Sequence, residues 1–177
     1  DLSCSAVAVV GVGNVAMDVT RVLSCNVDEL AKTDAAGHAI EALRASKVKT
    51  VWLLGRLGPA EAAYSPVEIA ELGELDVCDL VIDPKEAALD EVSKKELADL
   101  AVKKKVDYVQ EHAKKGEGTK DRKIRARFRV SPVEVIGKDG RVAAVRIEKN
   151  KRVADDKGRV KCVGIGEVAT IPIGMIL

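Results

Sequence analysis

Short apolar runs alternate with amphipathic segments along the first half of the chain. Three runs have the length and composition of buried strands: Ala6–Val10, Val51–Leu54 and Asp79–Ile82. Apolar residues at helical spacing follow the first run, from Asn14 to about Ser24, and Asn14 is suited to cap that helix. Strands that alternate with helices in this way predict a β-α-β core with a parallel sheet.

Further helices are predicted at Val27–Leu30, at His38–Arg44, from Ser65 to about Leu72, and at Ser93–Lys115. The third of these begins with the sequence S-P-V-E, a capping box with proline at the first helical position. In such a box the glutamate, here Glu68, accepts a hydrogen bond from the capping residue. The fourth segment is long and mostly polar.

The hydrophobic pattern changes to a period of two after about residue 121. Apolar residues between Ile124 and Val130 alternate with the basic residues Lys123, Arg125, Arg127 and Arg129. One charged face of this kind is typical of an antiparallel strand exposed to solvent. We therefore expect the second half of the chain to form an antiparallel sheet.

Turn signals and a last apolar run complete this second part. The sequences Lys138-Asp139-Gly140 and Asp156-Lys157-Gly158 predict turns, and Ile173–Leu177 predicts a final strand. The expected fold class is α/β: a Rossmann-like domain with a central parallel sheet, flanking helices and an antiparallel β-meander. Residues 1–177 are expected to form this single domain.

A glycine-rich turn joins the first strand to the first helix. Gly11-Val12-Gly13-Asn14-Val15-Ala16 matches the G-x-G-x-x-G/A fingerprint, with a strand before it and a helix after it. The glycines allow a tight turn and a close approach of phosphate, and the helix N-terminus attracts its charge. The motif predicts a site for the pyrophosphate of a dinucleotide. The alternative is a strand-turn-helix connection that uses glycine only for its turn.

The second strand indicates which dinucleotide would bind. NAD sites usually carry an acidic residue at the end of this strand, whereas here the strand ends in Gly55-Arg56. A guanidinium at this place can bind the 2′-phosphate of NADP through paired hydrogen bonds. Arg56 therefore favours NADP, unless it is simply a solvated loop residue.

Composition and charge exclude several other classes of function. The net charge is +1 and aromatic residues make up 2% of the chain, so neither a basic surface nor base stacking predicts nucleic-acid binding. No apolar run approaches the roughly 20 residues that span a bilayer. Because the chain begins with Asp1 rather than Met, we expect an excised or processed chain whose targeting segment is missing.

The cysteines and histidines do not predict a metal site. The four cysteines lie far apart without a C-x-x-C pair, which favours free buried thiols in a reducing compartment. His38 and His112 have no ligand pattern around them, and we expect surface or capping roles for both.

Three blocks of sequence resemble the NADP-binding domain of the adrenodoxin reductase family, flavin-dependent ferredoxin–NADP reductases of glutathione-reductase type. The blocks are Val10–Val19, the stretch from Ala39 through Arg56 to Pro59, and Phe128 with Ser131–Val135. Weaker similarity covers the whole chain. The second block is the most specific, because its long two-helix connection to a G-R-R-G-P motif is typical of this family.

The resemblance implies roles for individual residues. In the family the glycine loop binds the pyrophosphate, which carries over to Gly11, Val12, Gly13, Asn14 and Val15. The first arginine of the family's pair matches Arg56 and would bind the 2′-phosphate, but Leu57 stands where the second would be. Glu68 matches a glutamate on the nicotinamide side of the cofactor, besides its role in the capping box.

The resemblance also implies partners outside this chain. Members pass a hydride from NADPH to FAD and then single electrons to ferredoxin or adrenodoxin, and their FAD domain flanks the NADP domain. We expect FAD in the full-length enzyme only, so the isolated domain should be inactive. In this family basic residues of the long helix dock the iron–sulfur protein, here Lys103, Lys104 and Lys105, although the same lysines suit a solvated helix face.

The sequence leaves alternatives for both the cellular location and the function. Val163–Glu167 and the final Gly174–Leu177 are more similar to mitochondrial than to bacterial members, so we expect the mitochondrial matrix, or the bacterial cytoplasm if the source is not eukaryotic. Leu57 is also compatible with a domain of an NAD(H)-using flavoprotein. A third possibility is a non-catalytic module that senses nucleotides through the same fold.

Overall fold

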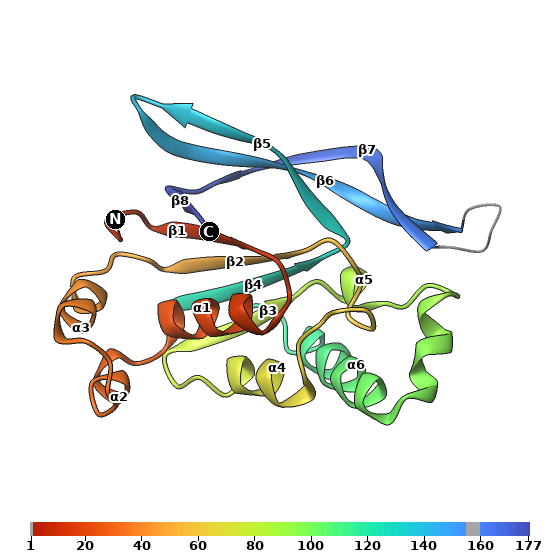
Figure 1. The fold of residues 1–177 in the computed structure, drawn as a ribbon, viewed down its shortest axis with the longest axis horizontal. Coiled ribbons are helices and arrows are strands. Elements are labelled where there is room, and N and C mark those ends of the chain that lie inside the picture. The colour runs from red at the N-terminus through yellow and green to blue at the C-terminus, as the bar shows by residue number, and fades with distance from the viewer. Residues whose placement is uncertain (1, 155–159) are drawn as a thin grey trace.

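Three layers make up the structure, a computed structural model that describes residues 2–154 and 160–177 (Figure 1). A parallel sheet forms the middle layer, helices cover one of its faces, and an antiparallel sheet covers part of the other. Asp1 and the turn predicted at Asp156-Lys157-Gly158 lie outside the described residues.

The parallel sheet has the strand order β3-β4-β2-β1-β8. Its strands are β1 (Ala6–Val10), β2 (Thr50–Gly55), β3 (Cys78–Ile82), β4 (Arg122–Phe128) and β8 (Met175–Ile176). Every neighbouring pair is parallel. The carboxyl ends of all these strands therefore meet at one edge of the sheet, where α/β folds usually bind ligands.

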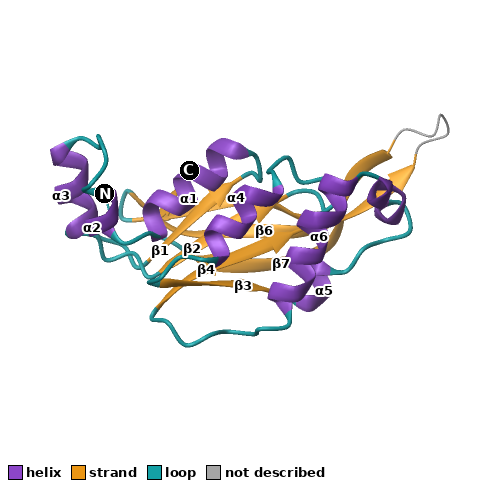
Figure 2. Ribbon diagram, turned by 90° about the horizontal axis from the view of Figure 1, so that it is seen from below, coloured by secondary structure: helices purple, strands orange, loops and turns teal. Residues whose placement is uncertain are grey.

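Helices lie across one face of this sheet (Figure 2). They are α1 (Asn14–Ser24), α2 (Val27–Leu30), α3 (Gly37–Arg44), α4 (Pro66–Gly73), α5 (Pro84–Ala87), the 3₁₀ helix η1 (Ser93–Ala98) and α6 (Leu100–Ala113). The predicted helix Ser93–Lys115 is thus wrong as one element. Asp99 interrupts it, because its carboxylate caps α6 by accepting hydrogen bonds from the backbone N–H groups of Ala101 (2.7 Å) and Val102 (3.2 Å).

The antiparallel sheet contains β5 (Val130–Lys138), β6 (Arg141–Ala154) and β7 (Val160–Pro172), with β6 in the centre. Asp139 and Gly140 form the predicted turn between β5 and β6, with φ angles of 52° and 73°. Positive φ at both central residues is the geometry for which the Asp-Gly pair is selected.

Two apolar cores hold the layers together. Alternate residues of β1 point to opposite faces, so Val7 and Val9 join the core under the helices while Ala8 joins the second core. The second core lies between the two sheets and brings Leu54 of β2 against Ile147 of β6, with both side chains almost fully buried. The antiparallel sheet is therefore packed onto the parallel sheet by apolar contacts.

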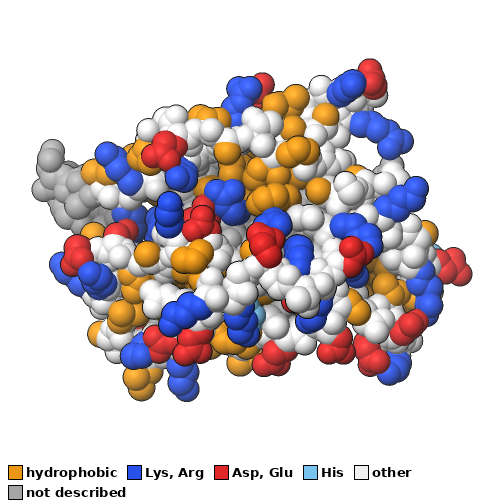
Figure 3. All heavy atoms as spheres, turned by 180° about the vertical axis from the view of Figure 1, so that it is seen from behind, with side chains coloured by type: hydrophobic (Ala, Val, Ile, Leu, Met, Phe, Trp, Pro, Cys, Tyr) orange, Lys and Arg blue, Asp and Glu red, His pale blue; other side chains and the backbone are white. Residues whose placement is uncertain are grey.

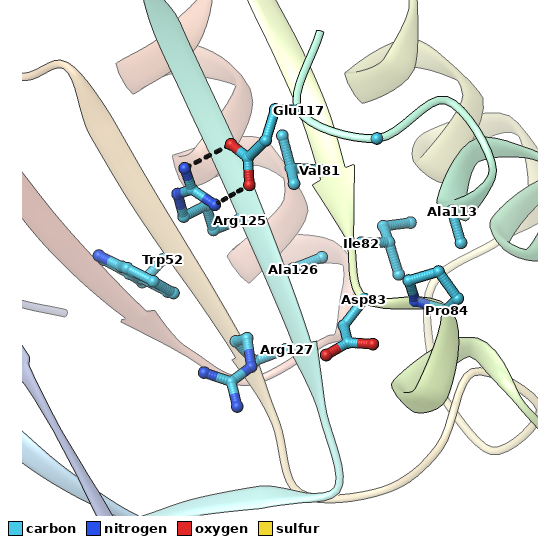
Figure 4. A pocket seen from close by; sticks show the side chains of 11 residues that line it. Trp52, Val81, Ile82, Asp83, Pro84, Ala113, Glu117, Arg125, Ala126 and Arg127 are labelled. Atoms are coloured by element: carbon cyan, nitrogen blue, oxygen red, sulfur yellow. Dashed lines mark hydrogen bonds and ion pairs between the residues drawn. The ribbon is translucent and has the colours of Figure 1, made fainter.

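The prediction that β4 is an antiparallel strand with a solvated basic face is wrong. β4 lies inside the parallel sheet between β2 and β3, and acidic partners neutralise three of its basic side chains, while Arg122 donates to the carbonyls of Leu23 and Cys25. The pairs are Lys123–Asp79 (2.8 Å), Arg125–Glu117 (2.6 Å) and Arg127–Glu86 (2.7 Å). Figure 4 shows Arg125 and Glu117 joined by two hydrogen bonds beside a cavity of about 530 Å³.

Acidic and basic side chains are intermixed on the side of the molecule seen in Figure 3. This distribution agrees with the net charge of +1. That side therefore offers no surface of a single charge to a highly charged partner.

Candidate nucleotide-binding site

The glycine-rich turn lies at the carboxyl end of β1, between the central strand β2 and the edge strand β8. Gly11 has a φ of +123°, which side chains rarely tolerate, and its N–H donates to the carbonyl of Leu54 (2.9 Å). Gly55, at the end of β2, is a second glycine that the turn requires. A Cβ at Gly55 would lie 2.8 Å from a methyl carbon of Val12, so glycine here lets the turn approach β2.

The N-terminus of α1 opens directly onto this turn. The capping residue is Gly13 rather than the predicted Asn14, which is instead the first helical residue. No side chain caps the helix and its first turn contains no acidic residue. The first N–H groups of a helix lack intrahelical partners, so this end offers donors and a partial positive charge to an anion.

An apolar groove of about 380 Å³ runs beside the turn. It is lined by Val9, Val10, Gly11, Gly13, Asn14, Val15, Ala16, Val19 and Leu177. Val15, one of the apolar residues at helical spacing, is 77% exposed. The N-terminal end of α1 is thus bordered by uncovered apolar surface.

The segment after β2 forms the opposite wall of the site. The carbonyl of Val12 accepts hydrogen bonds from the backbone N–H groups of Ala63 and Tyr64, both at 3.1 Å, so this segment is tied to the glycine turn. Arg56 is exposed at its start, and its guanidinium forms no ion pair with the residues that the structure describes. Leu57 follows it and is partly buried. The fold brings Arg56 and the glycine turn to the same edge.

Glu68 lies in the first turn of α4, in the capping box that the sequence predicted. Its carboxylate accepts a hydrogen bond from the N–H of Ser65 (2.6 Å), and the Ser65 hydroxyl accepts one from the N–H of Glu68 (3.3 Å). Glu68 therefore has a structural role. A contact with the nicotinamide remains a prediction.

Backbone carbonyls at the start of this wall accept hydrogen bonds from side chains of the antiparallel sheet and from the backbone of Arg129, which precedes it, and the sequence did not predict these contacts. The carbonyl of Arg56 accepts hydrogen bonds from Asn150 Nδ2 (3.3 Å) and from the thiol of Cys162 (3.2 Å). The carbonyl of Leu57 accepts one from the N–H of Arg129 (3.1 Å), a residue with a φ of 55°. Arg129 also interrupts the regular strand geometry between β4 and β5.

A buried polar cluster supports the middle of the same wall. The Glu61 carboxylate accepts hydrogen bonds from the N–H of Gly58 (3.1 Å) and the hydroxyl of Ser93 (2.6 Å), and it pairs with Arg152 of β6. The side chains of Glu61 and Arg152 are only 11% and 9% exposed. No motif marks this cluster, because only the contact between Gly58 and Glu61 is local, while Ser93 and Arg152 reach Glu61 through the tertiary fold.

The three lysines predicted to dock a partner do not share one surface. Lys103 pairs with Asp107, and Lys104 is exposed. Lys105 is 7% exposed, and its ammonium group donates to the carbonyl of Ala62 and lies 5.7 Å from the ring centre of Tyr64. Burial lowers the pKa of Lys105, although nearby acidic residues oppose the shift. Lys105 supports the same wall and does not present its charge to solvent.

The cysteines and histidines are accounted for by packing. All four cysteines are free thiols; Cys78 is buried and the others are partly buried. His38 is exposed, but His112 is 5% exposed and stacks on Tyr108, so the predicted surface or capping role is wrong for His112. Within the described residues, no three His, Cys, Asp or Glu side chains cluster as a metal site would require. None of the described helices has the length and apolar character to cross a membrane.

Comparisons with known proteins agree with this geometry. The chain is 36% identical over its whole length to the NADPH-ferredoxin reductase FprA of Mycobacterium tuberculosis, and 35% identical to the mitochondrial NADPH:adrenodoxin oxidoreductase of Bos taurus. It spans 39% and 38% of the lengths of these relatives. No protein-family model matches it.

The fold of this chain also matches that of a solved reductase structure. The structure of Mycobacterium tuberculosis FprA in complex with NADPH superimposes on 99% of this chain with a TM-score of 0.90, and 38% of that protein is covered. The resemblance inferred from the three sequence blocks is therefore confirmed. The chain is homologous, along its whole length, to one part of the NADPH-dependent ferredoxin and adrenodoxin reductases.

Proposed function

We propose that this chain is the NADP(H)-binding domain of a flavin-dependent ferredoxin or adrenodoxin reductase. Its role is to hold NADPH so that the nicotinamide faces a flavin bound elsewhere in the whole protein. The observation that carries the proposal is the uncapped N-terminus of α1 at Gly13, at the same strand-end edge as Arg56, which is exposed and has no ion pair within the described part of the chain. The homology to reductases, one of them in complex with NADPH, supports the same role.

The residues present fit a dinucleotide with a 2′-phosphate. Gly11, Val12, Gly13, Asn14 and Val15 would bind the pyrophosphate through backbone N–H groups and the end of α1. Arg56 would bind the 2′-phosphate with its exposed guanidinium. Glu68 would lie on the nicotinamide side while it keeps its place in the capping box.

The hydride is supplied by NADPH when it is bound, and this chain contributes binding and orientation. In this arrangement the segment after β2 would hold the adenosine end through Arg56, and the exposed apolar groove beside Val15 would leave the other end free to meet a flavin domain. The glycine spacing recurs at Gly164–Ala169, but that run lies inside strand β7 with no helix after it, so of the two runs only the turn at Gly11 has the strand-turn-helix context of a dinucleotide site. We therefore assign FAD and the ferredoxin or adrenodoxin partner to the whole protein. Its location would be the mitochondrial matrix or the bacterial cytoplasm.

Calorimetric titration with NADPH and NADH, at low and high salt, tests the proposal. We expect NADPH to bind more tightly than NADH, and Arg56→Ala to remove most of this preference. A charge-assisted hydrogen bond contributes about 1.5–3 kcal/mol, so the NADPH affinity should fall roughly 10- to 150-fold. The matched control is Arg44→Ala, an arginine paired with Asp28 near α2 and α3, which should leave both affinities unchanged.

Two other outcomes would favour other functions. Equal binding of NADH and NADPH would indicate that Leu57 in place of a second arginine has removed the preference, and an NAD(H)-using flavoprotein would fit better. Binding of neither nucleotide would contradict the proposed site.

A separate measurement tests whether flavin belongs outside this chain. We expect the purified chain to carry no stoichiometric FAD and to show no NADPH oxidation with a ferredoxin. Stoichiometric flavin absorbance in the purified chain would contradict this division of roles.

A further inference from the structure

The backbone that carries Arg56 is fixed mainly by residues from other elements. Its carbonyl accepts hydrogen bonds from Asn150 Nδ2 and the Cys162 thiol, and the next carbonyl accepts one from the N–H of Arg129. Asn150 is 9% exposed and itself is held in place: its Nδ2 donates to the Ser131 hydroxyl (2.8 Å) and its N–H to the Arg129 carbonyl (2.7 Å). These two hydrogen bonds therefore fix the orientation of the Asn150 side chain that donates to the Arg56 carbonyl.

A second set of contacts holds the backbone at Gly58, two residues after Arg56. Glu61 accepts a hydrogen bond from the N–H of Gly58, which bends the segment back on itself. Arg152 pairs with Glu61 and donates to the Ser93 hydroxyl (3.0 Å), so β6 and η1 both hold this carboxylate. Asn150 and Arg152 lie two residues apart on one strand, and their side chains therefore point to the same face of β6.

We propose that Asn150, Glu61 and Arg152 are positioning residues for the 2′-phosphate of NADP(H). They fix the backbone of the segment Arg56–Gly58, and so determine where the Arg56 guanidinium can reach. The inference rests on the proposed function, because it concerns how that site distinguishes NADPH from NADH. The antiparallel sheet thereby takes part in nucleotide selection without contacting the nucleotide.

The geometry separates recognition of the 2′-phosphate from binding of the pyrophosphate, which NADPH and NADH share. The pyrophosphate would be bound by the Gly11 turn and α1, which belong to the parallel sheet and its helix layer. The 2′-phosphate would be bound by a side chain whose backbone is held from the antiparallel sheet. Displacement of the Arg56 segment should therefore weaken NADPH binding and leave NADH binding nearly unchanged, since NADH has no 2′-phosphate.

The test compares Asn150→Ala and Glu61→Gln with a matched control in calorimetric titrations of this chain. Asn150→Ala removes a donor to the Arg56 carbonyl, and Glu61→Gln leaves Arg152 without its counter-charge. The control is Asp79→Asn, which breaks the pair with Lys123, also largely buried, on β3 and β4 away from this segment. We expect the Kd for NADPH to rise on the order of tenfold in the two variants and the Kd for NADH to change less than about twofold.

Hydrogen exchange of the Gly58 amide gives a readout that does not depend on nucleotide. We expect this amide to exchange faster in Glu61→Gln than in Asp79→Asn. The free energy of unfolding of each variant, measured in urea, is used to correct the exchange rates for differences in overall stability. Unchanged exchange together with an unchanged NADPH-to-NADH preference would overturn the inference and leave the proposed function intact. A parallel loss of NADPH and NADH affinity would also overturn it, because it would indicate general unfolding of the site. A wild-type chain that binds neither nucleotide would instead contradict the proposed function.

Discussion

Gly55 shows how one missing side chain shapes the nucleotide site. A Cβ at this position would meet Val12 at 2.8 Å and the backbone carbonyl of Arg127 at 3.4 Å. Gly55→Ala should therefore push the glycine turn away from β2, weaken binding of NADPH and NADH alike, and destabilise the fold by about 1–3 kcal/mol. Nucleotide titration and urea unfolding measure the two effects.

The double variant Val12→Ala with Gly55→Ala serves as the control. It removes the methyl groups that the new Cβ would meet, so it should recover part of the lost affinity. If the double variant binds nucleotide no better than Gly55→Ala, the contact with Val12 is not the cause.

The surroundings of His112 predict that the stability of the chain depends on pH. Its ring is packed against Tyr108 and Gly73, and its Nε2 lies 3.5 Å from the ammonium group of Lys115. Burial, with a further contribution from Lys115, lowers the pKa of His112 in the folded state, although Asp79 opposes the shift. The unfolded chain, with a histidine pKa near 6.5, therefore takes up a proton before the folded protein does.

The free energy of unfolding should consequently fall as the pH decreases below about 6.5. Urea unfolding at several pH values between 7.5 and 5.5 measures this slope. His112→Gln should flatten it, because glutamine does not titrate. An identical slope in the variant would show that His112 does not contribute.

At the scale of elements, the capping box of α4 serves both the fold and the candidate site. Ser65→Ala removes the acceptor for the Glu68 N–H and should cost about 1 kcal/mol of stability, measured by urea unfolding. Glu68→Gln keeps an oxygen that can accept from Ser65 but removes the charge. If Glu68 acts only in the capping box, Glu68→Gln should leave NADPH affinity and stability nearly unchanged, whereas a change in affinity alone would indicate a role toward the nicotinamide.

The elements that were predicted correctly are those with strong local signals. β1, α1, β2, β3 and α4 follow apolar runs and the capping box, and their bounds lie within one or two residues of the predictions. Asn14 was wrongly assigned as a cap because its side chain suits that position, while the glycine before it adopts the cap geometry without any side-chain bond.

β4 and the supporting residues of the site could not be predicted from local pattern. Alternating apolar and basic residues look the same on an exposed strand and on a buried one whose charges are paired. The acids that pair with β4, Asp79, Glu86 and Glu117, lie 8 to 44 positions away in the sequence, so only the fold reveals the pairing. Asn150 lies 94 positions from Arg56, and Glu61 lies 3 positions from Gly58. No sequence motif marks either contact.

For the whole molecule, the second core predicts that the two sheets unfold together. The single tryptophan, Trp52, packs beside this core, while the helices lie on the opposite face of the parallel sheet. Tryptophan fluorescence and helical circular dichroism should therefore show coincident urea transitions. Ile147→Ala, in the second core, should shift both transitions by about 2–5 kcal/mol. A shift in fluorescence alone would indicate that the antiparallel sheet unfolds separately.

The strand β6 also limits which length changes this protein can accept during evolution. Ile147 lies in the second core, Asn150 and Arg152 hold the Arg56 segment, and a register shift between Glu148 and Asn150 separates the two groups. Deletion of a single residue at this shift would turn Asn150 and Arg152 to the opposite face of the strand while the core half stayed in place. Homologues that keep NADP(H) should therefore vary in the composition of β6 but rarely in its length at this point.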